Sequence, residues 1–167
     1  MQAPICEICL KSDILCSACQ NKLETNKITK AEIDVSRFVY VLSDKVKSLG
    51  DIKIEKVIES NSLIIVAKKG DAAKLVGKGG SVVKALAKQF GKSIKIIEQS
   101  GNFKEFMINL LSPINITGIN VLYTPSGEVY KIRVTGIQKT PMPMNNEDVI
   151  QLASSLFNKQ AEIVVEN

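Results

Sequence analysis

The residues whose types and spacing point most directly to chemistry are the cysteines. They form two Cys-x-x-Cys pairs at the start of the chain, and the rest of the sequence contains no other cysteine. Each pair can fold as a tight knuckle that directs two thiolates at one ion, and four thiolates complete the tetrahedral set that zinc prefers in structural sites. The predicted ligands of one structural zinc ion per chain are Cys6, Cys9, Cys16 and Cys19.

Two other uses of these thiols remain open. Iron takes the same ligand set, and a Cys-x-x-Cys pair can also act as a redox dithiol. A catalytic zinc is disfavoured because four cysteines close its coordination shell. The segment between Glu7 and Ser17 is too short to enclose a hydrophobic core. We therefore expect the metal to supply most of the folding free energy of this module.

Composition narrows the function classes. The 167 residues include no histidine, which removes mechanisms that need an imidazole as a base or ligand, and no motif for a catalytic pocket is found, so we expect a binding protein and not an enzyme. The start of the chain has no basic segment followed by a long apolar stretch. The apolar runs are also far shorter than a membrane span. We expect a cytoplasmic protein, in which paired cysteines bind metal more often than they form disulfides.

A glycine-rich turn at residues 77–80 is the second place where chemistry can be argued. Without Cβ atoms, its glycines let a sugar-phosphate chain approach the backbone amides, and the following helix points its positive end at the same place. Residues 68–95 contain eight lysines and one acid, a net charge of +7, whereas the rest of the chain carries −2. This concentration of charge indicates a phosphate-bearing partner.

A glycine-rich turn of this kind has two alternative roles. A nucleoside-triphosphate P-loop needs a glycine five positions before the Gly-Lys pair and Ser or Thr after it. Ala72 and Gly79 occupy these places, so the pattern fails twice. A purely structural turn leaves the lysines on both sides of it unexplained.

The elements around the turn can be predicted from periodicity and caps. A capping box from Thr29 to Glu32 starts a long amphipathic helix that Gly50 ends. Alternation in the first strand slips at Lys56, and Ser81 is expected to cap the helix after the glycine turn. The predicted order is helix, strand, strand, short helix, turn, helix, strand, at residues 29–50, 52–59, 63–69, 71–76, 77–80, 81–90 and 94–97.

Residues 101–167 are predicted to be an altered second copy of this plan. The predicted helices and strands are residues 103–111, 114–123, 128–135, 147–157 and 163–165. In place of the glycine turn stands the segment from Gln138 to Asp148, with no GxxG and with the run Pro141-Met-Pro-Met144. We expect that run to be a solvated linker. A protein contact through exposed methionines is the alternative.

The sequence from Ala73 to Ile97, with its glycine turn, resembles a KH domain, and the element order resembles the type II topology. Two such units joined by a short helix are similar to archaeal NusA-like proteins. The resemblance implies that the turn is a GxxG loop that clamps about four single-stranded nucleotides, beside an apolar groove near Leu75, Val76 and Ile96. The candidate RNA-binding residues are Gly77, Lys78, Gly79, Gly80, Lys74, Ser81, Lys84 and Lys88.

The fold expected from this resemblance is α+β. It consists of a zinc knuckle or ribbon in residues 1–28, a type II KH domain in residues 29–100, and a degenerate α-β-β-α-α-β unit in residues 101–167. The implied function is RNA binding in transcription elongation or termination, with RNA polymerase as partner. A ribosome-associated or ribosome-biogenesis factor on ribosomal RNA and the small subunit is one alternative. A protein-binding scaffold with a structural glycine turn is another.

Overall fold

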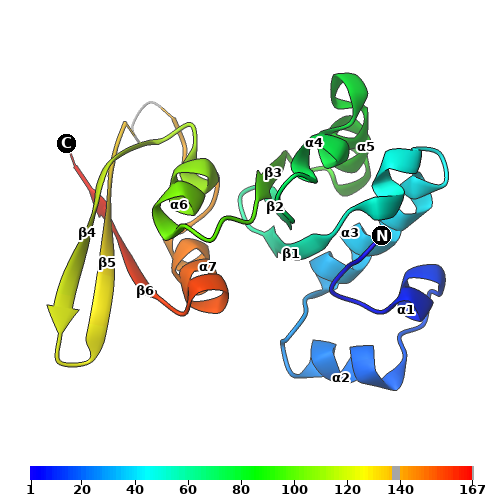
Figure 1. Cartoon of the computed structure of the whole chain (residues 1–167), viewed down its shortest axis with the longest axis horizontal. Helices are drawn as coiled ribbons and strands as arrows, with labels where there is room; N and C mark the ends of the chain where they lie inside the picture. Colours follow the sequence, from blue (N-terminus) through cyan, green and yellow to red (C-terminus); the bar gives the residue numbers. More distant parts are fainter. Residues whose placement is uncertain (137–139, 167) are drawn as a thin grey trace. The chain divides into compact units, whose positions relative to one another are not determined.

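The computed structural model describes residues 1–136 and 140–166. Contacts divide the chain into two compact units, Met1–Gln99 and Ser100–Asn167, and each unit is an α+β structure with its own three-stranded sheet (Figure 1). Within the described residues, no helix is long and apolar enough to cross a membrane.

The first unit has ten elements, of which two are short 3₁₀-helices (η). They are α1 (Glu7–Lys11), α2 (Ser17–Glu24), α3 (Lys30–Ser43), η1 (Lys47–Asp51), β1 (Ile54–Glu59), β2 (Leu63–Ala67), α4 (Ala72–Val76), η2 (Lys78–Gly80), α5 (Ser81–Phe90) and β3 (Ile94–Glu98). The strand order is β1-β2-β3, with β1 antiparallel and β3 parallel to β2. From α3 onward this is the predicted order of elements.

The central strand β2 is buried along its whole length and anchors the core of the first unit. Val35 and Val39 of α3, Leu75 of α4 and Leu86 of α5 are fully buried in the cluster that contains β2 residues. The predicted slip in β1 is confirmed, because its register with β2 shifts between Ile54 and Lys56. The sheet therefore fixes α4, α5 and the turn between them.

The capping box that opens α3 is present, but the predicted end of the helix is wrong. The Thr29 side chain accepts from the N–H of Glu32, and the Glu32 carboxylate accepts from the N–H of Thr29. The helix ends at Ser43 and not at Gly50, and a 3₁₀ turn follows at Lys47–Asp51. This tighter turn brings Leu49 into the core, where its exposure is 0%.

The prediction that Ser81 caps α5 is also wrong. The N-cap residue is Gly80, whose φ of 75° lies in the left-handed region that glycine adopts without strain. Ser81 already has helical angles and is the first residue of α5. Gly91, with φ of 63°, ends the helix as expected.

The cysteine-containing segment does not stand alone. A buried cluster joins this segment to Ile28 and to Ile33 of α3. Its members from the segment are Ile5, Cys9, Leu10 and Cys19. The segment makes apolar contacts with α3. It belongs to the same compact unit, Met1–Gln99, and does not form a unit of its own. Burial of these apolar side chains also stabilises the segment, so the metal supplies a smaller share of its folding free energy than expected from the sequence.

The second unit repeats the topology with fewer helices. Its elements are α6 (Phe103–Leu111), β4 (Asn115–Thr124), β5 (Gly127–Thr135), α7 (Asn146–Phe157) and β6 (Gln160–Val165). The strand order is β4-β5-β6, again antiparallel and then parallel. Between β5 and β6 the described residues contain one helix, at the place of the predicted helix 147–157, whereas an intact α-β-β-α-α-β unit would have two.

The proline- and methionine-rich run before α7 is solvated only in part. Pro141 is exposed and Met142 is partly exposed, but Met144 is fully buried, so both the linker and the exposed-methionine interpretations fail at Met144. Its side chain instead helps to fix the approach to α7, because burying it removes apolar surface from water. Of the predicted segment 138–148, residues 138 and 139 lie outside the described residues.

Candidate nucleic-acid interface and metal site

The glycine turn lies between the short helix α4 and α5, and its backbone explains its composition. Gly77, Gly79 and Gly80 have φ values of 76°, 60° and 75°. A Cβ on Gly77 would also lie 2.6 Å from Cγ2 of Val82, closer than real contacts allow. At Gly79 an added Cβ would meet nothing within 4 Å, so the outer side of the turn is open.

The amino end of α5 is left without a side-chain cap. Its N-cap residue is glycine, which has no side chain to accept from the first backbone N–H groups of the helix. Those donors and the positive end of the helix dipole favour an anion at this place. The open turn and the uncapped helix together form a surface on which a phosphate can approach the backbone.

The predicted lysines surround this surface to different degrees. Lys78 and Lys88 are exposed. Lys84 donates to the carbonyl oxygen of Gly79 at 3.3 Å, which holds its ammonium group beside the turn. Lys74 forms an ion pair with Asp71 at 2.9 Å, so part of its charge is already neutralised. The structure thus holds Lys84 beside the turn and leaves Lys78 exposed on it, whereas Lys88 lies in the last turn of α5.

One part of the predicted apolar groove is not available. Leu75 is fully buried in the core, because a residue in the middle of a one-turn helix that packs on the sheet faces inward. Val76 remains 40% exposed and Ile96 is half-buried. Val76 directly precedes the loop, Ile96 packs against the core from β3, and Leu75 has a structural role.

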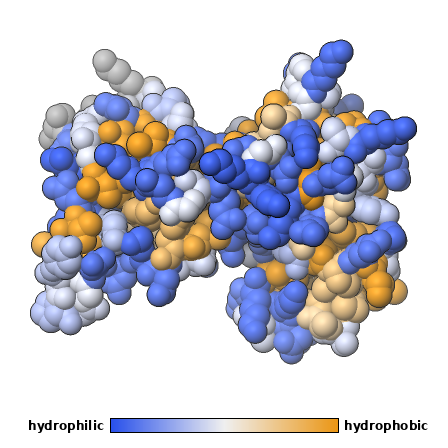
Figure 2. Space-filling model, in the orientation of Figure 1, coloured by the Kyte–Doolittle hydropathy of each residue, from blue (hydrophilic) through white to orange (hydrophobic). Residues whose placement is uncertain are grey.

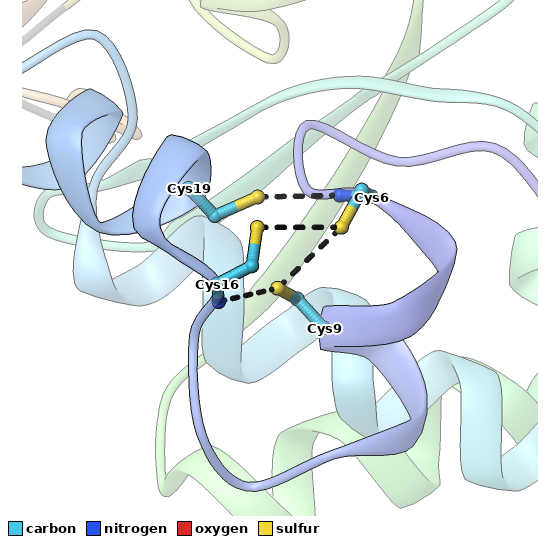
Figure 3. Close-up of side chains that lie close together, drawn as sticks. All are labelled: Cys6, Cys9, Cys16 and Cys19. Atoms are coloured by element: carbon cyan, nitrogen blue, oxygen red, sulfur yellow. Dashed lines mark hydrogen bonds between the residues drawn. The ribbon is translucent and has the colours of Figure 1, made fainter.

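The four cysteine sulfurs converge on one point, as Figure 3 shows. All four Sγ atoms lie within 4.8 Å of one another, and the Cys6 sulfur is 3.5 Å from that of Cys9 and 3.8 Å from that of Cys16. A tetrahedral zinc with ligands about 2.3 Å away places its sulfurs about 3.8 Å apart. The geometry therefore fits a four-thiolate metal ion.

Backbone donors and the cysteine electrostatics support the same conclusion. The N–H of Cys16 donates to the Cys9 sulfur at 3.1 Å, and the N–H of Cys6 to the Cys19 sulfur at 3.5 Å. The N–H of Cys19 and the neighbouring Cys9 thiol lower the pKa of Cys16 to about 7. At Cys9, the N–H of Cys16 lowers the pKa, but burial and the other thiols outweigh it and raise the pKa to about 12. A bound cation would relieve this crowding of thiolates.

Arg37 is a residue at this site that sequence reasoning missed. From α3 its Nε donates to the carbonyl oxygen of Cys9 at 2.9 Å, which ties the first cysteine pair to the KH-like core. The two residues are 28 positions apart, and no local pattern marks such a pair. Only the packing of α1 against α3 reveals the contact.

The family model of the KH domain matches residues 20–121, more than half of the chain, and this chain belongs to the KH domain family. The match begins within α2 and includes the glycine turn and α5.

Two curated relatives are named "Probable transcription termination protein NusA". The protein from Methanococcus vannielii is 33% identical over 88 residues, which are 53% of this chain and 51% of the relative. That from Methanocaldococcus jannaschii is 32% identical over 66 residues, 40% of this chain and 36% of the relative. The matched part thus spans about half or less of each relative.

Among solved structures, the crystal structure of APE1850 resembles this chain with a TM-score of 0.55 at 24% identity, over 78% of this chain and 96% of the other. At this identity the likeness concerns the fold. It supports an α+β KH-like architecture over most of the chain.

Proposed function

We propose that this protein is a non-enzymatic RNA-binding protein that holds single-stranded RNA on the loop from Gly77 to Gly80. One observation carries the proposal: α5 begins at an uncapped glycine, next to an open turn with lysines around it. KH domains use a GxxG loop to clamp about four nucleotides by their backbone. The clamp residues are Gly77, Lys78, Gly79, Gly80 and Ser81, with Lys74, Lys84 and Lys88 at their sides.

The second unit offers a contrast that supports the first as the clamp. Its helix α7 is capped by Asn145, whose Oδ1 accepts from the N–H of Asp148 at 2.8 Å. Glu147 and Asp148 add negative charge to the first turn. A phosphate would meet an occupied donor and two carboxylates there. We assign the RNA contact to the first unit and a supporting role to the second.

The biological setting belongs to the same proposal. The names of the two relatives support a NusA-like factor in transcription termination. We propose that it holds nascent RNA in the cytoplasm near RNA polymerase, in elongation or termination. The four cysteines would hold one structural zinc ion, whose role is to fix α1 and α2 against α3.

The decisive test is a titration of single-stranded RNA against the double variant Lys78→Asp with Gly79→Asp. Two negative charges on the outer face of the turn should repel the RNA backbone, so affinity should fall by about tenfold or more. The dependence of binding on salt should also weaken, because fewer counterions are released. Fluorescence anisotropy at several salt concentrations measures both.

A matched control is the double variant Lys22→Asp with Lys27→Gln. Both lysines are exposed and lie outside the basic segment. This control changes net charge by the same amount and should keep nearly all of the affinity. Equal loss in the two double variants, or no loss in the first, contradicts the clamp.

A further inference from the structure

A groove on the first unit is not used by the proposed clamp. It has a volume of about 390 Å³ and lies where α3, α5 and the loop between the cysteine pairs meet. We call it the α3–α5 groove, and define it by Asp13, Asp34, Arg37, Phe38, Val41 and Phe90.

The floor of the α3–α5 groove is apolar. Phe38 of α3 and Phe90 of α5 pack edge to face with ring centroids 5.8 Å apart, and neither ring is fully buried. Val41, one turn further along α3, is 57% exposed. Aromatic rings beside an exposed aliphatic side chain form a surface that an apolar anchor can cover.

The apolar surface continues from the groove onto the cysteine-containing segment. Ile14 directly follows Asp13 and is 78% exposed, and Ile8 on α1 is 73% exposed. Figure 2 shows hydrophobic surface gathered over the region of α1. Large exposed apolar side chains beside a groove are typical of a contact with another protein.

Three charged residues of the groove lack a partner for at least one polar group among the described residues. The Nη2 atom of Arg37 is buried and has no hydrogen-bond partner in the described part of the chain. The carboxylates of Asp13 and Asp34 are exposed, and neither forms an ion pair with another described residue. A buried donor without a partner is costly unless a ligand or water supplies an acceptor.

Charge decides between a protein and a nucleic acid as occupant. The two carboxylates would repel phosphates, and residues 1–28 carry three basic and three acidic residues, so they have no net charge. The glycine turn with Lys78 lies at the other end of α5, about 15 Å from Phe90 along the helix axis, whereas Lys88 lies near the groove end of α5. Carboxylates beside an apolar floor instead match a basic residue next to an apolar one.

We propose that the α3–α5 groove binds a short segment of a partner protein in which an apolar side chain lies next to lysine or arginine. The apolar side chain packs on Phe38, Val41 and Phe90. The basic group of the segment pairs with Asp13 and Asp34. This site is separate from the RNA loop, so RNA and the peptide segment can bind at the same time.

The experiment uses the purified full chain and three fluorescein-labelled peptides. One peptide has a central leucine flanked by lysines, one has glutamates in place of the lysines, and one has serine in place of leucine. Fluorescence polarisation should show saturable binding of the first peptide and at least about tenfold weaker binding of the other two. Absence of binding up to millimolar concentration, or equal binding of the glutamate peptide, overturns the proposal.

Substitutions in the groove test where the peptide binds on the protein. Asp34→Lys and Val41→Glu change exposed groove residues and should each weaken binding by about tenfold or more. Asp44→Lys makes the same charge change on the exposed end of α3, outside the groove, and should bind as the parent does. Equal binding by Asp34→Lys and the parent overturns the proposed pairing.

Competition separates this site from the RNA clamp and from other occupants. The Lys78→Asp, Gly79→Asp double variant should keep full peptide affinity, whether or not it binds RNA. Displacement of the peptide by a single-stranded RNA oligonucleotide would identify the groove as a nucleic-acid site and overturn the proposal. A dimer in light scattering that Val41→Glu dissociates would identify a second copy of this chain as the occupant, with the same consequence.

Discussion

At the scale of single residues, Gly77 is the most constrained position of the proposed clamp. Its φ of 76° favours glycine, and its neighbour Val82 occupies the space that a Cβ would need. The loop therefore depends on two independent requirements at one residue, conformational freedom and close approach. Gly79 depends only on the first of them, because the space around it is open.

Gly77→Ala should lower the free energy of unfolding by on the order of 1–3 kcal/mol, because both the backbone and the contact with Val82 become strained. Urea denaturation measures this change. Gly50→Ala is the matched control, since Gly50 has no positive φ and its added Cβ would meet nothing within 4 Å. Equal destabilisation by the two substitutions would show that crowding at Gly77 is not the cause.

At the scale of elements, the beginnings of α3 and α5 are built in opposite ways. Thr29 and Glu32 cap α3 reciprocally, and Glu32 is buried. The start of α5 has no such partner and is open for a ligand. A side-chain cap thus stabilises the helix that supports the sheet, whereas the helix beside the loop has no side-chain cap that would compete with a ligand.

Thr29→Ala should therefore cost about 1 kcal/mol of stability, because it removes the acceptor for the N–H of Glu32. Ser81→Ala should change stability by less than about 0.5 kcal/mol, because Ser81 is the first helical residue and caps nothing. Thermal or urea unfolding of both variants measures the difference. A cost at Ser81 as large as that at Thr29 would contradict the assignment of Gly80 as the N-cap.

The sequence predicts the elements well where a local cause specifies them. The helix 103–111 agrees at both ends with α6, whose first turn is capped by Asn102. The capping box at Thr29 and the stop at Gly91 are also confirmed. Two other predictions failed because burial decides them. Leu49, beyond the end of α3, and Leu75, which was predicted to line the apolar groove beside the glycine turn, both lie in the core. No neighbouring residue in the sequence specifies that burial.

At the scale of the whole molecule, the cysteine site and the KH-like fold of the first unit are mechanically joined. The cluster around Cys9 and Cys19 includes Ile33 of α3, and Arg37 donates to the carbonyl of Cys9. A change in metal occupancy should therefore alter the local stability of the first unit. The second unit has its own sheet and core, so it should be unaffected.

Removal of the metal with a chelator should raise amide hydrogen exchange in α1, α2 and the first turns of α3, because the four thiolates lose the ion that holds them together. Exchange in β4, β5 and β6 should stay the same. Mass spectrometry measures both regions in one experiment, and metal analysis of untreated protein should give about one zinc per chain.

The control for this experiment is the variant Cys6→Ser with Cys16→Ser, which should show the raised exchange without chelator and no further change with it. A native protein that contains no metal and keeps slow exchange in α1 and α2 would contradict the zinc site. Uniform change in both units would contradict the expectation that metal removal affects only the first unit.

By itself the sequence determined the short-range features: the cysteine pairs, the glycine turn, the lysine-rich segment and the order of strands and helices. Each of these follows from residue types a few positions apart, where backbone preference and spacing act. The tertiary structure alone decided which side chains became core, as at Leu75 and Met144, and which came together across the fold, as Arg37 did with Cys9. Such contacts depend on burial between distant segments, and no local pattern carries that information.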